Sequence, residues 1–151
     1  RHWSPVWTGL DVSIQKNITL KRKWSHPHGF SEDNFVHLPY DTYSRLRNSH
    51  PDVIISSELG LRTVQAALYR RSNPKSRLII WATLSEYTEQ GRGRLREWIR
   101  RWLIPSADAI IVNGESGARY IKRFGFPDEK IFRVPQTTDT TAHFRLPIAV
   151  N

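Results

Sequence analysis

The chain of 151 residues is 38% hydrophobic, which is enough for one domain with a buried core, and 25% charged, which is ordinary. Its net charge of +9 is not ordinary, and it favours an acidic partner such as nucleic acid, anionic lipid or a phosphorylated substrate. The absence of cysteine excludes disulfides and thiolate metal sites, and no apolar run approaches the roughly 18 residues of a membrane span.

The first third of the chain predicts a strand, a loop, a second short strand and a helix. Loose alternation favours a strand over residues 11–18, and the composition of residues 21–29 favours a loop. A short strand over residues 35–39 ends at a proline. Residues 40–48 have apolar side chains at helical spacing, with Asp41 or Thr42 as the N-cap.

The rest of the chain predicts alternating buried strands and amphipathic helices. Short apolar runs predict neighbouring parallel strands near residues 52–56, 77–82, 108–112 and 131–134. Helical spacing predicts helices over residues 61–71 and 95–103, and a further helix that begins near Glu115 and ends before Gly125. This order is typical of an α/β domain with a doubly wound parallel sheet that carries helices on both faces.

Polar turns follow three of these strands, at residues 56–58, 83–89 and 113–116. In open parallel sheets, ligands bind beyond the carboxyl ends of the strands, where helix N-termini offer unpaired N–H groups. Seven side chains are therefore predicted to line one binding rim: Glu58, Arg62, Glu86, Glu89, Asn113, Glu115 and Ser116. The alternative is that the Ser, Asn and Glu residues only cap helices, and that the Arg is a solvated surface residue.

Few residues offer catalytic chemistry. Glu86 and Glu89 lie three residues apart and would suit general acid–base work if burial raised a pKa, and Glu86 is the one catalytic candidate we name. The alternative is that both are solvated loop carboxylates. His26, His28 and His37 have no carboxylate or cysteine at metal-binding spacing, so the sequence predicts no metal site.

The helix predicted over residues 95–103 is strongly basic. Four arginines are candidates for a membrane or anion surface: Arg94, Arg96, Arg100 and Arg101. Trp98 and Trp102 lie one helical turn apart, and a basic face with an aromatic face is typical of interfacial membrane helices. We favour the alternative that the Trp side packs on the sheet, with the arginines attracting anionic headgroups from the exposed side.

Residues 106–144 resemble the end of the N-terminal domain of GT-B glycosyltransferases of the family-four type. In that family a strand, a polar turn and a helix precede the pattern G-x-P-x-x-K-I-x-x-x-P, which an Asp and a Phe follow. The matching positions here are Gly125, Pro127, Lys130, Ile131, Pro135, Asp139 and Phe144. Gln136, Thr137 and Thr138 stand where the family usually has Asn-Gly-Val. The resemblance extends back to about Pro51, and more loosely to about Asp11.

The resemblance implies that residues 1–144 form the Rossmann-like acceptor-side half of a GT-B architecture. Because the chain has no Met and begins with Arg1, we expect its natural N-terminus to be missing. The glycine-rich turn that follows the family's first strand is not visible in this sequence, so we expect that strand to be missing too. Residues 145–151 would begin the linker to a C-terminal domain that binds the nucleotide-sugar donor. The chain alone would bind no cofactor, and without the donor domain it would be inactive. The resemblance implies that the full enzyme is a retaining transferase that needs no metal.

We therefore expect an acceptor-binding domain of a nucleotide-sugar-dependent glycosyltransferase that transfers a hexosyl group to a glycan, lipid-linked or small acceptor. Expected partners are the donor domain, the acceptor, an anionic membrane surface, and a second copy or another chain over exposed apolar surface. The expected location is the cytoplasm or the cytoplasmic face of a membrane. The alternative is a non-catalytic basic α/β domain that binds nucleic acid or an anionic surface, although no specific nucleic-acid module is present.

Overall fold

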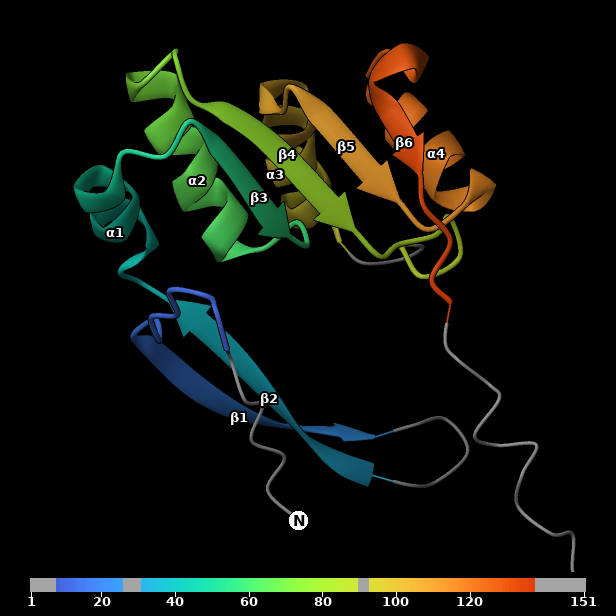
Figure 1. The fold of residues 1–151 in the computed structure, drawn as a ribbon. Helices are drawn as coiled ribbons and strands as arrows, with labels where there is room; N and C mark the ends of the chain where they lie inside the picture. Colours follow the sequence, from blue (N-terminus) through green and yellow to red (C-terminus); the bar gives the residue numbers. More distant parts are fainter. Residues whose placement is uncertain (1–7, 26–30, 90–92, 138–151) are drawn as a thin grey trace, which may run out of the picture.

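The computed structural model describes residues 8–25, 31–89 and 93–137, and a four-stranded parallel sheet forms its centre (Figure 1). The strands are β3 (Val53–Ser57), β4 (Arg77–Ala82), β5 (Ala109–Val112) and β6 (Ile131–Arg133). β3, β4 and β5 each pair in parallel with the strand that follows in the chain. The predicted strands and the α/β class are confirmed, and the sheet flanked by helices is consistent with a Rossmann-like doubly wound fold.

Three helices connect these strands and cover one face of the sheet. They are α2 (Leu61–Ser72), α3 (Arg94–Leu103) and α4 (Glu115–Lys122), and single 3-10 turns follow at Ile104–Ser106 and Asp128–Lys130. Alternate strand residues point toward them, because successive side chains of a strand lie on opposite faces. The buried strand residues are Ile54, Ser56, Leu78, Ile80, Ala82, Ile110, Val112 and Ile131.

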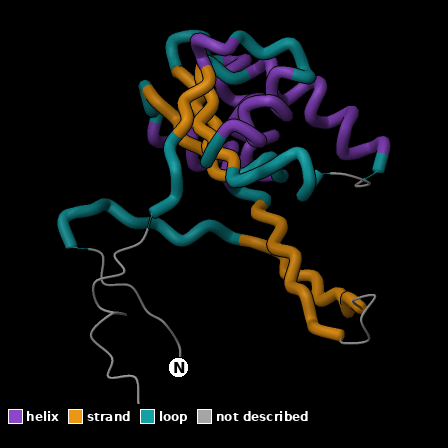
Figure 2. The backbone as a smooth tube through the Cα atoms, turned by 90° about the vertical axis from the view of Figure 1, so that its right-hand side faces the viewer, coloured by secondary structure: helices purple, strands orange, loops and turns teal. Residues whose placement is uncertain are grey.

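The opposite face of the sheet has no helix over it within the described ranges (Figure 2). Ile55 is 61% exposed and Phe132 is 53% exposed, and Val53 and Trp81 are exposed beside them. The expectation of helices on both faces is therefore wrong for this part of the chain. Right-handed crossovers between strands that are neighbours in sequence order place every connecting helix on the same face.

A β-hairpin precedes the sheet and projects away from it (Figure 1). It consists of β1 (Asn17–Ser25) and β2 (Ser31–Pro39), paired antiparallel from Asn17 with Pro39 to Ser25 with Ser31. The expected strand over residues 11–18 and the expected loop from residue 21 are therefore wrong in position. Pairing with β2 satisfies the backbone N–H and C=O groups of a segment whose basic composition suggested a loop.

The helix expected over residues 40–48 is confirmed as α1 (Thr42–Ser49), with Asp41 at the N-cap position. Several expectations lie outside the described residues. These are the loop histidines His26 and His28, the family positions Asp139 and Phe144, and the linker at residues 145–151.

Asp108, just before β5, connects α2 and β4 to β5 through its carboxylate. Its carboxylate accepts hydrogen bonds from the Arg70 side chain of α2 at 3.0 and 3.2 Å, and from Nη1 of Arg77 at 3.1 Å. It also accepts the backbone N–H of Leu78 in β4 at 2.9 Å. One carboxylate thus joins a helix and two strands at the amino-terminal edge of the sheet.

We expect Asp108→Asn to lower the free energy of unfolding by about 2 kcal/mol at neutral pH, because it weakens charge-assisted hydrogen bonds. Burial of Asp108 opposes its ionisation, but the hydrogen bonds from Arg70, Leu78 and Arg77 outweigh burial and lower its pKa. A lowered folded-state pKa gives stability that is present above the unfolded-state pKa of about 3.9 and is lost as the pH falls below it. Urea unfolding should therefore show the difference between wild type and variant shrinking below about pH 4. The exposed Asp52→Asn is the control, and a difference that is independent of pH would contradict this role.

Gly117 permits the close approach of α4 to the rest of the fold. A Cβ atom at this position would lie 2.8 Å from the Leu84 carbonyl oxygen and 3.1 Å from Cβ of Val112. We expect Gly117→Ala to destabilise the protein by about 1–3 kcal/mol, despite the better helix propensity of alanine. Gly114→Ala, where an added Cβ meets nothing within 4 Å, is the matched control. Thermal unfolding of both variants measures the effect, and equal stability of the two would refute the argument.

The uncovered sheet face supports the expectation of a second copy or another chain. Exposed apolar surface of this kind is typical of association sites. Light scattering of the purified chain should give a mass above that of the 17.7 kDa monomer, and Phe132→Ser should shift the protein toward the monomer. A wild-type monomer at every concentration measured would contradict this prediction.

Candidate functional site

A cavity of about 330 Å³ lies beside the carboxyl ends of β3 and β4. Leu59 and Gly60 contribute to it from the turn before α2. Its polar lining consists of Glu58, Thr83, Thr88, Glu89, Arg96 and Arg100. This is the edge of a parallel sheet at which ligands bind in open α/β folds.

Glu58 is held in an uncommon backbone conformation at this cavity. Its φ of 65° lies in the left-handed region, which costs a non-glycine residue about 1–3 kcal/mol. The Glu58 N–H donates to the Trp81 carbonyl at 2.8 Å, and the Glu58 carbonyl oxygen accepts a hydrogen bond from the Thr63 hydroxyl. Its carboxylate accepts hydrogen bonds from the hydroxyl and the backbone N–H of Thr83. The neighbouring strand and helix therefore fix both the backbone and the side chain of Glu58.

Glu89 and Arg100 form a buried ion pair between this cavity and a second one. Both side chains are almost fully buried, and Nη1 of Arg100 also donates to the Tyr120 hydroxyl at 2.7 Å. Burial raises the pKa of Tyr120 above its ordinary value. The expectation that Arg100 belongs to an exposed anion surface is therefore wrong. Its charge is compensated inside the protein by a carboxylate from the loop before α3.

The exposed face of α3 is the one that carries the tryptophans. Trp98 is 67% exposed, Leu95 is 72% exposed and Trp102 is also exposed, whereas Arg100 is only 4% exposed and Leu103 is fully buried. The interpretation that the Trp side packs on the sheet is wrong. The ion pair with Glu89 allows the Arg100 side of the helix to turn inward, and this rotation places the Trp side in solvent.

Glu86 lines the second cavity, of about 550 Å³, between α3 and α4. Its carboxylate accepts a hydrogen bond from Nε of Arg119 at 2.9 Å, and its N–H donates to the Ser116 hydroxyl at 3.1 Å. These contacts tie the loop after β4 to the start of α4. The Ser116 hydroxyl is thus engaged in holding this loop.

Glu115 and Asn113 are also at the carboxyl edge of the sheet but line neither of these two cavities. The Glu115 carboxylate pairs with Nε of Arg133 at 2.5 Å, and Asn113 is exposed. The structure therefore places the predicted glutamates after β3, β4 and β5 along one edge, as parallel strands require. It brings Glu58 and Glu89 to one cavity and leaves Glu86 in the adjacent one.

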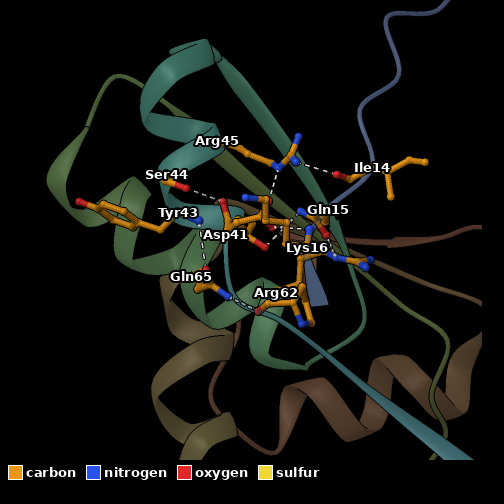
Figure 3. A network of polar contacts seen from close by, with 11 residues as sticks. Ile14, Gln15, Lys16, Asp41, Tyr43, Ser44, Arg45, Arg62 and Gln65 are labelled. Atoms are coloured by element: carbon orange, nitrogen blue, oxygen red, sulfur yellow. Dashed lines mark hydrogen bonds and ion pairs between the residues drawn. The ribbon is translucent and has the colours of Figure 1, made fainter. Parts of the chain in front are cut away.

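Arg62 belongs to a separate network that joins the N-terminal segment to α1 and α2 (Figure 3). Its Nε donates to Oε1 of Gln15 at 2.8 Å and its Nη1 donates to the Ser57 hydroxyl at 3.4 Å. Nearby, Asp41 accepts the Lys16 N–H at 3.0 Å and Nε of Arg45 at 2.5 Å. Arg62 thus lines a third cavity, of about 630 Å³, on the hairpin side of α2 and not the cavity of Glu58.

Sequence reasoning missed the two threonines at the cavity and the left-handed backbone of Glu58. Thr83 and Thr88 do lie in a polar turn after a predicted strand, and this signal could have found them. In the described ranges no three His, Asp or Glu side chains gather as a metal would require. No helix in those ranges is long and apolar enough to cross a membrane.

Comparison with known proteins identifies the family of this chain. The family model of Glycosyltransferase Family 4 matches residues 8–142, which confirms the resemblance drawn from residues 106–144. Comparison with curated proteins gives no match. Because the family model covers most of the chain, from the segment before the hairpin to beyond the last strand of the sheet, the protein belongs to Glycosyltransferase Family 4.

Proposed function

We propose that this chain is the acceptor-binding domain of a nucleotide-sugar-dependent glycosyltransferase, and that the cavity at Glu58 receives the acceptor. The observation that carries this proposal is the fixed Glu58 carboxylate beside the Thr83 hydroxyl at the carboxyl edge of the sheet. Carboxylates and hydroxyls are suitable partners for sugar hydroxyls, and charge-assisted hydrogen bonds are the stronger ones. Backbone strain held by its surroundings is common at binding sites, which adds support.

The remaining polar groups suit supporting roles. The buried pair of Glu89 and Arg100 forms a rigid polar wall between the two cavities. Glu86 pairs with Arg119 and holds the loop that carries Thr88 and Glu89. We therefore assign Glu86 a positioning role and not a catalytic one. Glu58 thereby replaces Glu86 as the residue on which acceptor binding is expected to depend most.

The donor side of the reaction lies, in this proposal, in a second domain that follows in a longer polypeptide. That domain would bind the nucleotide sugar, and the transfer of the hexosyl group would be retaining and independent of a metal. The acceptor is a glycan, a lipid-linked sugar or a small hydroxyl compound. The chain of 151 residues alone is expected to transfer no sugar.

We expect Glu58→Gln, in the enzyme with its donor domain, to lower kcat/KM for the acceptor by about tenfold to a hundredfold. The reason is the loss of a charge-assisted hydrogen bond worth roughly 1.5–3 kcal/mol to a sugar hydroxyl. The KM for the nucleotide sugar should stay within about twofold of wild type, because the donor binds elsewhere. Initial-rate kinetics with each substrate varied in turn separates the two effects.

Glu115→Gln is the matched control, because Glu115 lies on the same edge of the sheet but pairs with Arg133 outside the cavity. Its acceptor kinetics should remain near those of wild type. Unchanged kinetics in Glu58→Gln would show that its carboxylate is not needed for acceptor binding. An equal loss in both variants would show that the effect is not specific to the cavity at Glu58.

A further inference from the structure

We propose that α3 is a membrane-docking helix, which lies on an anionic lipid bilayer and inserts Leu95, Trp98 and Trp102 at the interface. The surface formed by these three residues with Arg94 and Arg101 is called the α3 surface below. This proposal does not rest on the acceptor cavity, because none of these five residues lines it.

The first support is the exposure of large apolar side chains on one side of a single helix. Leu95 and Trp98 are 72% and 67% exposed, and Trp102 is exposed beside them. The three are separated by three and four residues, which places them on the same helical face. The opposite face of α3 is occupied by the core, through Leu103 and the buried Arg100. Within the described residues, α3 thus has an inner face that packs on the core and an apolar outer face that is exposed.

The second support is the arrangement of charge around the apolar side chains. Arg94 and Arg101 lie four residues before and three residues after Trp98, so each is about one helical turn from it on the same face. Together with Glu97 and Trp98 they line a shallow cavity of about 270 Å³. Glu97 pairs with Arg101 at 2.8 Å, and that hydrogen bond and the charge of Arg101 lower its pKa. Arg94 and Arg101 together outweigh this one carboxylate.

The neighbouring helix extends this positive charge. Arg123 in the turn after α4 lines the cavity between α3 and α4 together with Arg94 and Arg101. Three glutamates also line this cavity, and each pairs with an arginine: Glu86 with Arg119, Glu89 with Arg100 and Glu97 with Arg101. The Arg123 guanidinium lies 6.0 Å from the centre of the Tyr120 ring. The whole chain carries a net charge of +9, so its long-range field also favours a negative surface.

A bilayer suits this combination better than other partners. Tryptophan and arginine are typical of the headgroup level of a membrane, where the ring has both apolar and polar surroundings and the cation contacts lipid phosphate. Duplex DNA would engage the arginines but would offer no apolar environment to Leu95 and the two tryptophans. A second copy packed by two-fold symmetry would place the same arginines against each other, and like charges repel.

Vesicle binding by the complete chain tests the proposal. Co-sedimentation with phosphatidylcholine vesicles that contain about one third phosphatidylglycerol should show binding that weakens as salt rises. Pure phosphatidylcholine vesicles should bind much less. The double variant Leu95→Ser/Trp98→Ser should abolish binding, and Arg94→Gln and Arg101→Gln should each weaken it about fivefold. Circular dichroism checks that each variant remains folded.

Two matched controls distinguish binding through the α3 surface from nonspecific hydrophobic adsorption and from nonspecific attraction by any exposed positive charge. Tyr40→Ser removes a comparably exposed aromatic side chain from the segment before α1, and Arg71→Gln removes an exposed arginine from the end of α2. Both should bind vesicles nearly as well as wild type.

Several results would overturn the proposal. They are equal binding to neutral vesicles, loss of binding in Tyr40→Ser with retention in the α3 double variant, and preference for duplex DNA over anionic vesicles. Self-association that the α3 double variant abolishes would also overturn it, because a second copy would then cover the α3 surface.

Discussion

Each of the strands β3, β4 and β5 pairs with the strand that follows it in the chain, and one α-helix makes each connection from β3 to β6. Because such crossovers have one hand, this order places α2, α3 and α4 on the same face of the sheet. The same order directs the carboxyl ends of all four strands to one edge. The covered core, the bare opposite face and the edge with the polar cavities therefore have one common cause.

Polar groups inside the fold are used mainly to connect its elements. Asp108 joins α2 to β4 and β5, and the pair of Glu89 and Arg100 joins the loop before α3 to α3 itself. A buried charge is tolerated only when a partner compensates it, and removal of one partner is more costly than the pair is stabilising. These contacts fix the rotation of α3, which in turn decides which of its faces meets solvent.

The cavity at Glu58 and the α3 surface are separate parts of this domain, although the loop after β4 contributes to both. That loop begins at Thr83 beside Glu58 and continues through Glu89, which anchors Arg100. The inward turn of Arg100 leaves Trp98 and Leu95 outside. A glycosyltransferase domain that docks through α3 would hold its cavity at a constant orientation to the membrane.

The parallel strands, the helices between them, the family and the polar turns at the strand ends could all be predicted from the amino-acid sequence. These features depend on local apolar runs and on short motifs, which a single sequence displays directly. Four features could be seen only in the folded protein: the pairing of β1 with β2, the sheet face that the described residues leave uncovered, the left-handed backbone of Glu58 and the burial of Arg100. Each of these depends on partners distant in the chain: Arg100 meets Glu89 and Tyr120, and Glu58 meets Trp81 and Thr83. Helical periodicity alone orients α3 with its tryptophans inward. The ion pair with Glu89 reverses that orientation, because it allows the side of the helix that carries Arg100 to be buried.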